Sequence, residues 1–172
     1  MHDVHEHSHK WVNQVEQMLK LFGHRNWVLI ADSAFPMLSS SGVKTLVTET
    51  DHVEVLRTVL GHIQQCPHIR PIVHIDAELA YIDEQDAPGI TTLRQQFNQL
   101  LNGIEVHRES HLDLINKVSD AAKLFHVLVL KTTIALPYTT VFIELDCGYW
   151  DSSKEDKLRR RMRCETSSHD VS

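Results

Sequence analysis

The apolar stretch from Trp27 to Ala31 is the feature that most constrains the fold of this chain. It contains no charged residue and is short and rich in β-branched side chains, which is typical of a strand buried on both faces. Gly23 precedes it and can adopt the left-handed conformation that ends a helix. The residue before Pro36 is kept out of the helical region, so the chain has to turn soon after the strand. The stretch therefore predicts a helix end, a buried strand and a turn in succession.

Helical and strand-like patterns alternate along the rest of the chain. Glu54 follows Asp51 by three residues in a capping-box pattern, which assigns both carboxylates to the start of a helix. Repeated alternation implies parallel strands with helices on the sheet faces, whereas the last strand is expected to be antiparallel. The predicted fold class is α/β, with three layers (α/β/α) and a mostly parallel, mixed central sheet. Strands are expected at 27–31, 43–49, 71–75, 104–107, 127–130 and 139–145, and helices at 11–23, 51–66, 89–101 and 109–124.

Length and charge indicate one domain that does not bind nucleic acid. A chain of 172 residues is long enough to bury about two thirds of the surface of its unfolded form in one core. The formal charge of −6 disfavours binding to a phosphate backbone, because nucleic-acid-binding domains carry clustered positive surface. The basic cluster of Arg159–Arg161 and Arg163 is offset by acidic neighbours. We expect a single domain over residues 11–150 and no nucleic-acid partner.

The cysteines and the apolar runs bear on the cellular compartment. Cys66, Cys147 and Cys164 are odd in number and show no CxxC spacing, so neither a disulfide framework nor a zinc site is indicated. A reducing compartment fits best. The sequence shows no secretory leader pattern and no run long enough to span a bilayer. We expect a cytoplasmic protein with no membrane partner.

Both ends of the chain differ from its middle. His2, His5, His7 and His9 crowd the first ten residues, and such a tract can chelate a divalent metal. Residues 1–10 lack apolar periodicity, so we expect a disordered terminus that binds metal only adventitiously. Residues 151–172 form a charged tail, either mobile or a short helix that docks on a neighbouring subunit.

Asp32 is the first candidate site residue. It follows the buried strand directly, and ligands of open α/β sheets bind outside the carboxyl ends of the strands. His24, in the turn after the first helix, is the second candidate, although a turn histidine can also simply cap the preceding helix. Five carboxylates fall within 76–86, but their spacing does not match an EF-hand loop. We expect that run to be an acidic surface loop or short helix.

Two motifs resemble those of one known family. The first is Gly23-His24 followed by the strand that ends in Ala31-Asp32-Ser33-Ala34-Phe35-Pro36, and the second is Leu136-Pro137-Tyr138-Thr139-Thr140-Val141-Phe142-Ile143. In this order and separation they resemble the Gly-His, Ala-Asp-x-x-x-Pro and Pro-Tyr-x-Asn motifs of the ribose pyranase and fucose mutarotase family. The resemblance covers roughly residues 12 to 150.

This resemblance implies an isomerase that interconverts the ring forms or anomers of a small reducing sugar. Such a reaction needs one group to take the anomeric hydroxyl proton and another to protonate the ring oxygen, and it requires neither metal nor cofactor. Histidine suits proton transfer near neutral pH. By motif, His24 would be the acid/base, Asp32 its partner or a sugar ligand, and Tyr138 a sugar ligand and possible second proton carrier. His111 is similar to a substrate-binding histidine of the pyranase branch.

The chain also departs from the family pattern. Thr140 stands where an asparagine is usual, and Lys131-Thr132-Thr133 replaces a turn that carries a glutamate, so Lys131 and Thr140 are the substrate contacts expected to differ. These departures keep open a second reading, a monosaccharide-binding or regulatory protein without catalysis on the same scaffold. A metal-dependent hydrolase is disfavoured, because the HxH spacing occurs only among the histidines of the first ten residues, which we expect to be disordered.

Members of the family assemble into rings, typically decamers, in which a neighbouring subunit closes the site. The resemblance therefore implies a homo-oligomer. In that case Tyr149 and Trp150 would belong to an interface. The alternative is that these two aromatic residues cap the core of their own chain.

Overall fold

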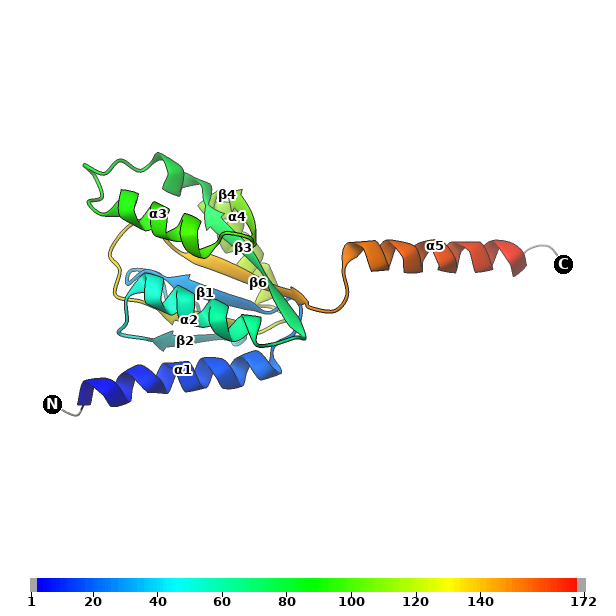
Figure 1. The fold of residues 1–172 in the computed structure, drawn as a ribbon, viewed down its shortest axis with the longest axis horizontal. Helices are drawn as coiled ribbons and strands as arrows, with labels where there is room; N and C mark the ends of the chain where they lie inside the picture. The colour runs from blue at the N-terminus through cyan, green and yellow to red at the C-terminus, as the bar shows by residue number, and fades with distance from the viewer. Residues whose placement is uncertain (1–2, 170–172) are drawn as a thin grey trace.

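The structure is a computed structural model that describes residues 3–169, with side chains described over 10–164. It contains six strands and five α-helices, with one short 3₁₀ helix (Figure 1). The strands are β1 (Trp27–Ala31), β2 (Val43–Val47), β3 (Ile69–Asp76), β4 (Glu105–Glu109), β5 (Val127–Lys131) and β6 (Val141–Cys147). The helices are α1 (Asp3–Leu21), α2 (His52–Gln64), η1 (Ala77–Tyr81), α3 (Ile90–Leu100), α4 (His111–Ala121) and α5 (Ser152–His169).

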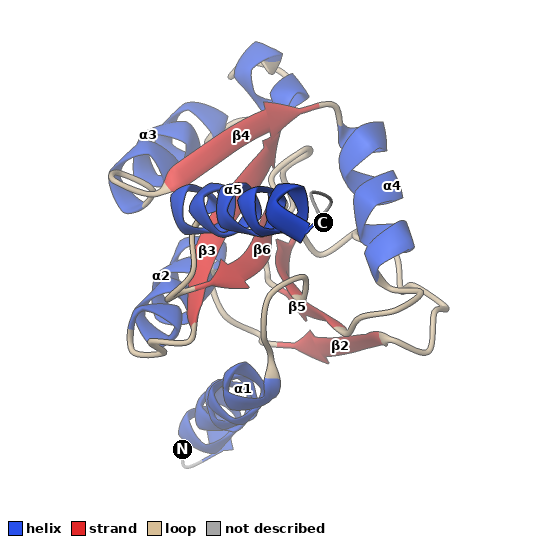
Figure 2. Cartoon of the chain, turned by 90° about the vertical axis from the view of Figure 1, so that its right-hand side faces the viewer, coloured by secondary structure: helices blue, strands red, loops and turns tan. Residues whose placement is uncertain are grey.

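One mixed sheet organises the molecule, and its strand order is β2-β5-β1-β6-β3-β4. The pairs β1–β5, β2–β5 and β3–β4 are parallel, whereas β6 runs antiparallel to both β1 and β3. Figure 2 shows α4 on one side of the sheet and α2 and α3 on the other. The predicted α/β class with a mostly parallel, mixed sheet is confirmed, as is the antiparallel last strand.

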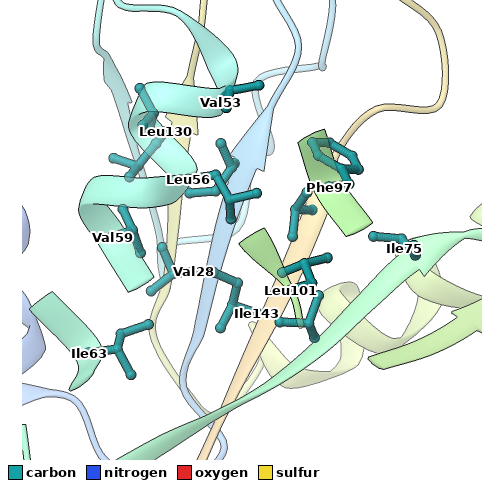
Figure 3. Close-up of a cluster of buried hydrophobic side chains, with 14 of the residues drawn as sticks. Val28, Val53, Leu56, Val59, Ile63, Ile75, Phe97, Leu101, Leu130 and Ile143 are labelled. Atoms are coloured by element: carbon teal, nitrogen blue, oxygen red, sulfur yellow. The ribbon is translucent and has the colours of Figure 1, made fainter. Parts of the chain in front are cut away.

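Alternate residues of the buried strands build a core on each face of the sheet. On one face Val28, Leu130 and Ile143 pack against α2, whose apolar side chains point at the sheet in Figure 3. On the other face Leu29 and Phe142 belong to a smaller cluster with residues of α4. Complete burial of a side chain of this size stabilises the fold by about 1.5–3 kcal/mol. The central strands are therefore a rigid frame for the groups at their ends.

Capping residues in the sequence determine where α2 and α4 begin. Asp51 caps α2, because its Oδ1 accepts the backbone N–H groups of Val53 and Glu54 at 2.9 and 3.2 Å. Ser110 caps α4 in the same way, and its Oγ accepts the N–H of Asp113 at 3.2 Å. The predicted structural role of Asp51 is confirmed.

The ends of the chain are more helical than the sequence indicates. Helix α1 begins at Asp3, so it includes most of the segment expected to be disordered. No glycine or proline interrupts residues 3–10, and a helix anchored from Trp11 onward extends at little cost. Helix α5 extends away from the rest of the chain in Figure 1, and Leu158 and Met162 are exposed on it. Its docking on a neighbouring subunit stays a prediction.

Tyr149 and Trp150 are both exposed, at 69% and 42%. They do not cap the core of their own chain, so that alternative is wrong. The role of the two aromatic residues in an interface stays a prediction. Among the described helices, none combines the length and apolar character needed to cross a membrane.

Candidate active site

A cavity of about 320 Å³ lies at one edge of the sheet. It forms there because β1, β3, β4 and β5 all end at this edge, which we call the carboxyl edge, and β6 begins there. The volume is near the lower limit for ligand pockets, which suits a small molecule. Its lining residues are Asp32, Ala34, Phe35, Pro36, Asp76, His111, Pro137, Tyr138 and Thr140.

Asp32 reaches the cavity from the end of β1. Its Oδ1 accepts the backbone N–H of Ala34 at 3.0 Å, which shapes the turn toward Pro36. The N–H of Ser33 donates to the carbonyl of Ile134 at 2.9 Å and ties this turn to the loop before β6. The other carboxylate oxygen of Asp32 remains available for a ligand, because no described residue bonds to it.

Asp76 and His111 form a pair at the same cavity. Asp76 is the last residue of β3 and its side chain is 0% exposed, whereas His111 opens α4 with its side chain 38% exposed. The Nδ1 of His111 lies 3.0 Å from Oδ1 of Asp76. Burial raises the pKa of the Asp76 carboxyl to about 6, opposed by the His111 imidazole and reinforced by the Glu78 and Asp32 carboxylates.

The second oxygen of Asp76 is unusual. Oδ2 is buried and has no hydrogen-bond partner among the described residues. Leaving a buried acceptor unpaired costs on the order of 1–3 kcal/mol. Such a group in a native structure needs an explanation, and a catalytic role is one.

Tyr138 and Thr140 come from the loop between β5 and β6. The ring of Tyr138 stands edge-on to His111, with ring centroids 5.5 Å apart and an interplanar angle of 88°. Tyr138 adopts φ 55°, a left-handed conformation that costs a bulky residue free energy. Thr140 is buried at the start of β6. The strained backbone therefore directs the tyrosine ring to the cavity.

His52 anchors the loop that carries these residues. It is completely buried, with Nε2 2.8 Å from the carbonyl of Thr139 and Nδ1 2.8 Å from Oγ1 of Thr132. Burial lowers the pKa of His52 to about 4, so the ring is neutral at neutral pH. Because a carbonyl only accepts, Nε2 carries the proton and Nδ1 is the bare nitrogen of the neutral ring. The Thr132 hydroxyl lies within donating distance of both Nδ1, at 2.8 Å, and the carbonyl of Ala31, at 3.0 Å. The N–H of Thr132 in turn donates to the carbonyl of Ala31 at 2.9 Å, beside Asp32.

Four of the predicted site residues meet at this cavity: Asp32, His111, Tyr138 and Thr140. His24 does not join them within the chain, because it is exposed in the turn before β1, and the five residues of β1 span roughly 16 Å. Lys131 is half-buried at the end of β5 but does not line the cavity, and it forms no ion pair with a described residue.

Two residues of this edge were missed by sequence reasoning. Asp76 was assigned to the acidic run at 76–86, yet it ends β3 and is buried, so the surface assignment is wrong for this residue. The available signal was its position directly after an apolar strand, the same as that of Asp32. His52 occupies the apolar stripe of α2, four residues before Leu56. A polar residue on such a stripe marks a buried hydrogen bond.

The described side chains include no group of three or more potential metal ligands. The side chains of His2, His5, His7 and His9 lie outside the described part, so the possible metal tract of the first ten residues stays a prediction.

Solved structures with this fold include two sugar complexes. RbsD of Bacillus subtilis complexed with D-ribose superposes with a TM-score of 0.56 at 15% identity, over 77% of this chain and 91% of that chain. The fucose mutarotase of Streptococcus pneumoniae in complex with L-fucose gives 0.52 at 14% identity, over 76% and 89%. No protein-family model and no curated protein matches the sequence. The resemblance carried by the two motifs is thus confirmed at the level of the fold.

Proposed function

We propose that the chain is a sugar mutarotase or pyranase that interconverts the ring forms or anomers of a small reducing monosaccharide. The observation that carries this proposal is the convergence of Asp32, His111 and Tyr138 on one small cavity. These groups place a carboxylate, an imidazole and a phenol within one site. Such groups can bind sugar hydroxyls and transfer protons. The shared fold with a ribose-bound and a fucose-bound protein supports the same class of ligand.

The reaction is a balanced exchange of protons. A base takes the proton of the anomeric hydroxyl while the bond from the anomeric carbon to the ring oxygen breaks. An acid gives a proton to that ring oxygen, and the open aldehyde form results. Reclosure reverses both transfers, either on the other face of the carbonyl or through another hydroxyl. No electron is gained or lost, so no redox cofactor is required.

We assign roles to the predicted site residues on this scheme. Asp32 binds sugar hydroxyls or orients the acid/base, and Tyr138 stacks on the sugar and donates one hydrogen bond. Thr140 contributes one hydroxyl to the cavity wall, and Lys131 adds a cation to the same edge of the sheet. The departures from the family at these two positions are expected to alter which sugar is preferred.

His24 can act at this cavity only if a second copy of the chain supplies it. The cavity of the same chain lies at the opposite end of β1. The exposed turn that carries His24 can instead contact a neighbouring subunit. A homo-oligomeric ring, possibly a decamer, would provide such an arrangement. We therefore propose His24 as an acid/base that operates across a subunit interface.

Magnetisation-transfer NMR on ribose, fucose and a panel of other reducing sugars tests the activity. The expected result is exchange between ring forms that exceeds the spontaneous rate with the wild type and collapses with Asp32→Ala. If no sugar exchanges faster than it does alone, the catalytic proposal is wrong.

A monosaccharide-binding or regulatory protein without catalysis is the second candidate. The missing asparagine at Thr140 and the missing glutamate near Lys131 favour it. It predicts saturable line broadening or shift changes of a sugar without accelerated exchange. The same NMR samples therefore distinguish the two functions.

A further inference from the structure

We infer that His111 is a proton carrier of the site and that Asp76 is the residue that positions it. This inference rests on the proposed function and deepens it, because it gives His111 a role beyond contact with the sugar. It also gives the cavity an acid/base that belongs to the same chain as Asp32 and Tyr138.

The contact between the two side chains fixes the tautomer of His111. A carboxylate accepts and does not donate, so the Nδ1 that lies 3.0 Å from Asp76 Oδ1 has to carry a proton. In the neutral ring Nε2 is then the bare nitrogen. Nε2 bonds to no described residue, and His111 lines the cavity with its side chain 38% exposed. A basic nitrogen is therefore available to a ligand.

Asp76 is placed to stabilise the charge that proton transfer creates. Its side chain is 0% exposed, and the second oxygen has no hydrogen-bond partner among the described residues. The carboxylate is thus poorly compensated while His111 is neutral. When Nε2 takes a proton, the imidazolium supplies the missing positive charge at hydrogen-bond distance. A buried carboxylate behind a histidine acts in this way in other proton-transferring enzymes.

The backbone holds the pair in place from both sides. Asp76 is fixed by the pairing of β3 with β4 and β6. The N–H of His111 donates to both carboxylate oxygens of Glu78 at 3.1 Å, which secures the first turn of α4. Glu78 therefore contacts the backbone of His111, whereas Asp76 contacts its ring.

This geometry assigns the proton steps. His111 Nε2 takes the proton of the anomeric hydroxyl as the ring carbon–oxygen bond breaks. The acid that gives a proton to the ring oxygen is the Tyr138 hydroxyl or His24 of a neighbouring copy. On reclosure the proton on Nε2 returns to the new anomeric hydroxyl, and the acid regains its own proton. The edge-on contact of the two rings, with centroids 5.5 Å apart, places both groups on one ligand.

Asp76→Asn is the first test, with Glu78→Gln as the matched control. Both changes turn a carboxylate into an amide at positions two residues apart, but only the first touches the ring. We expect Asp76→Asn to lower the saturated exchange rate by about 100-fold or more with little change in KM, because general acid–base groups contribute about 10²–10⁴-fold. Glu78→Gln should change the rate far less, because the amide oxygen of glutamine still accepts the backbone N–H of His111.

Nitrogen-15 NMR of the histidine rings supplies a readout that does not depend on activity. We expect Nδ1–H and a bare Nε2 for His111 in the wild type and in Glu78→Gln, and loss of this tautomer preference in Asp76→Asn. A wild-type ring protonated on Nε2 instead of Nδ1 overturns the inference. So does an unchanged exchange rate in a folded Asp76→Asn protein.

His111→Ala keeps the inference testable if Asp76→Asn does not fold, because His111 is half-exposed at a helix start. A proton carrier predicts a saturated rate lowered by about 100-fold or more, whereas a residue that only binds sugar predicts a raised KM at an unchanged saturated rate. If the wild type exchanges no sugar, the proposed function fails and the proton-carrying role fails with it. The tautomer of His111 would still decide whether the pairing exists.

Discussion

The two edges of the sheet differ in how far their polar groups are buried. At the carboxyl edge Asp76 and His52 are buried, at 1% and 0% exposure, around a cavity of about 320 Å³. At the opposite edge, which we call the amino edge, a larger hollow of about 700 Å³ is lined by Arg57, Arg70, Gln64, Asn102 and mostly apolar residues. His24 lies at that second edge and is exposed.

This difference shows why nearness in sequence misleads here. His24 and Asp32 are eight positions apart, yet a strand runs between them and places them at opposite edges. Asp32 and Tyr138 are over a hundred positions apart, yet β1 and β6 are paired neighbours and both residues line one cavity. Strand direction, rather than spacing, decides which groups can act together.

The largest expected effect tests whether residues from the two edges act at one site. His24→Ala and Asp32→Ala should each lower sugar exchange by about 100-fold or more, as loss of an acid/base or its partner does. If His24 serves the cavity of a neighbouring subunit, mixing the two inactive variants under conditions of subunit exchange restores activity, because some cavities then receive both residues. The measurement is magnetisation-transfer NMR before and after mixing.

Each variant taken alone through the same subunit-exchange conditions sets the baseline for that experiment. A mixture that stays inactive, although mass spectrometry shows mixed oligomers, rules out a shared site. Full activity of His24→Ala alone removes His24 from the mechanism and leaves proton transfer to the carboxyl edge.

A comparison of two histidines sharpens the contrast in stability. His52→Ala removes two buried hydrogen bonds and leaves a cavity, so we expect the free energy of unfolding to fall by about 3 kcal/mol. His68→Ala is the counterpart at the amino edge, where a half-buried ring contacts the carbonyls of Leu19 and Phe22 at 3.1 and 3.0 Å. It should cost about 1 kcal/mol. Urea unfolding of both variants measures the difference, and equal losses would contradict the contrast.

The pH dependence of stability separates the two buried groups of the carboxyl edge. The pKa of His52 is lowered to about 4 from 6.5, so the unfolded chain binds more protons and stability falls by about 3 kcal/mol as the pH drops from 6.5 to 4. The pKa of Asp76 is raised to about 6 from 3.8, so the folded chain binds more protons and stability rises over nearly the same interval. The two contributions oppose each other.

Single substitutions expose each contribution. Asp76→Asn should steepen the loss of stability below pH 6, because the effect of His52 is then unopposed. His52→Gln should flatten or reverse this loss of stability. Urea unfolding at a series of pH values between 4 and 7 gives the slopes, and parallel slopes for the two variants would contradict this account.

Exchange activity should also fall below about pH 6, where Asp76 takes a proton and loses the charge beside His111.

Much of this fold follows from local patterns. The run from Trp27 to Ala31 forms a strand with the predicted bounds, and Asp51 caps α2 as its spacing with Glu54 predicts. Such features depend on neighbours in sequence, which a single chain displays. Asp32 was identified in the same way, because the end of a strand can be read from composition.

The parts that sequence reasoning missed depend on contacts between distant segments. His52 is 80 positions from Thr132 and 87 from Thr139. Asp76 is 35 positions from His111. No periodicity connects such pairs, and an acidic run normally faces solvent. Only the order of the strands brings these groups to one edge.

The smallest expected effect concerns backbone strain, which occurs at both edges. Arg25 at the amino edge and Tyr138 at the carboxyl edge both have positive φ, at 72° and 55°. Relief of this strain by Tyr138→Gly should raise the free energy of unfolding by up to about 1 kcal/mol, since left-handed conformations of bulky residues cost about 1–3 kcal/mol and glycine loses part of that gain in entropy.

Tyr138→Phe is the control, because it keeps the ring and the strain but removes the hydroxyl. We expect its stability to match the wild type, while sugar exchange falls in both variants. A gain in stability with a loss of exchange in Tyr138→Gly would mean that the strain serves to hold the ring against His111. If Tyr138→Gly is no more stable than Tyr138→Phe, the left-handed turn is relaxed by its surroundings, and the orientation of Tyr138 comes from the anchoring of the loop by His52 alone.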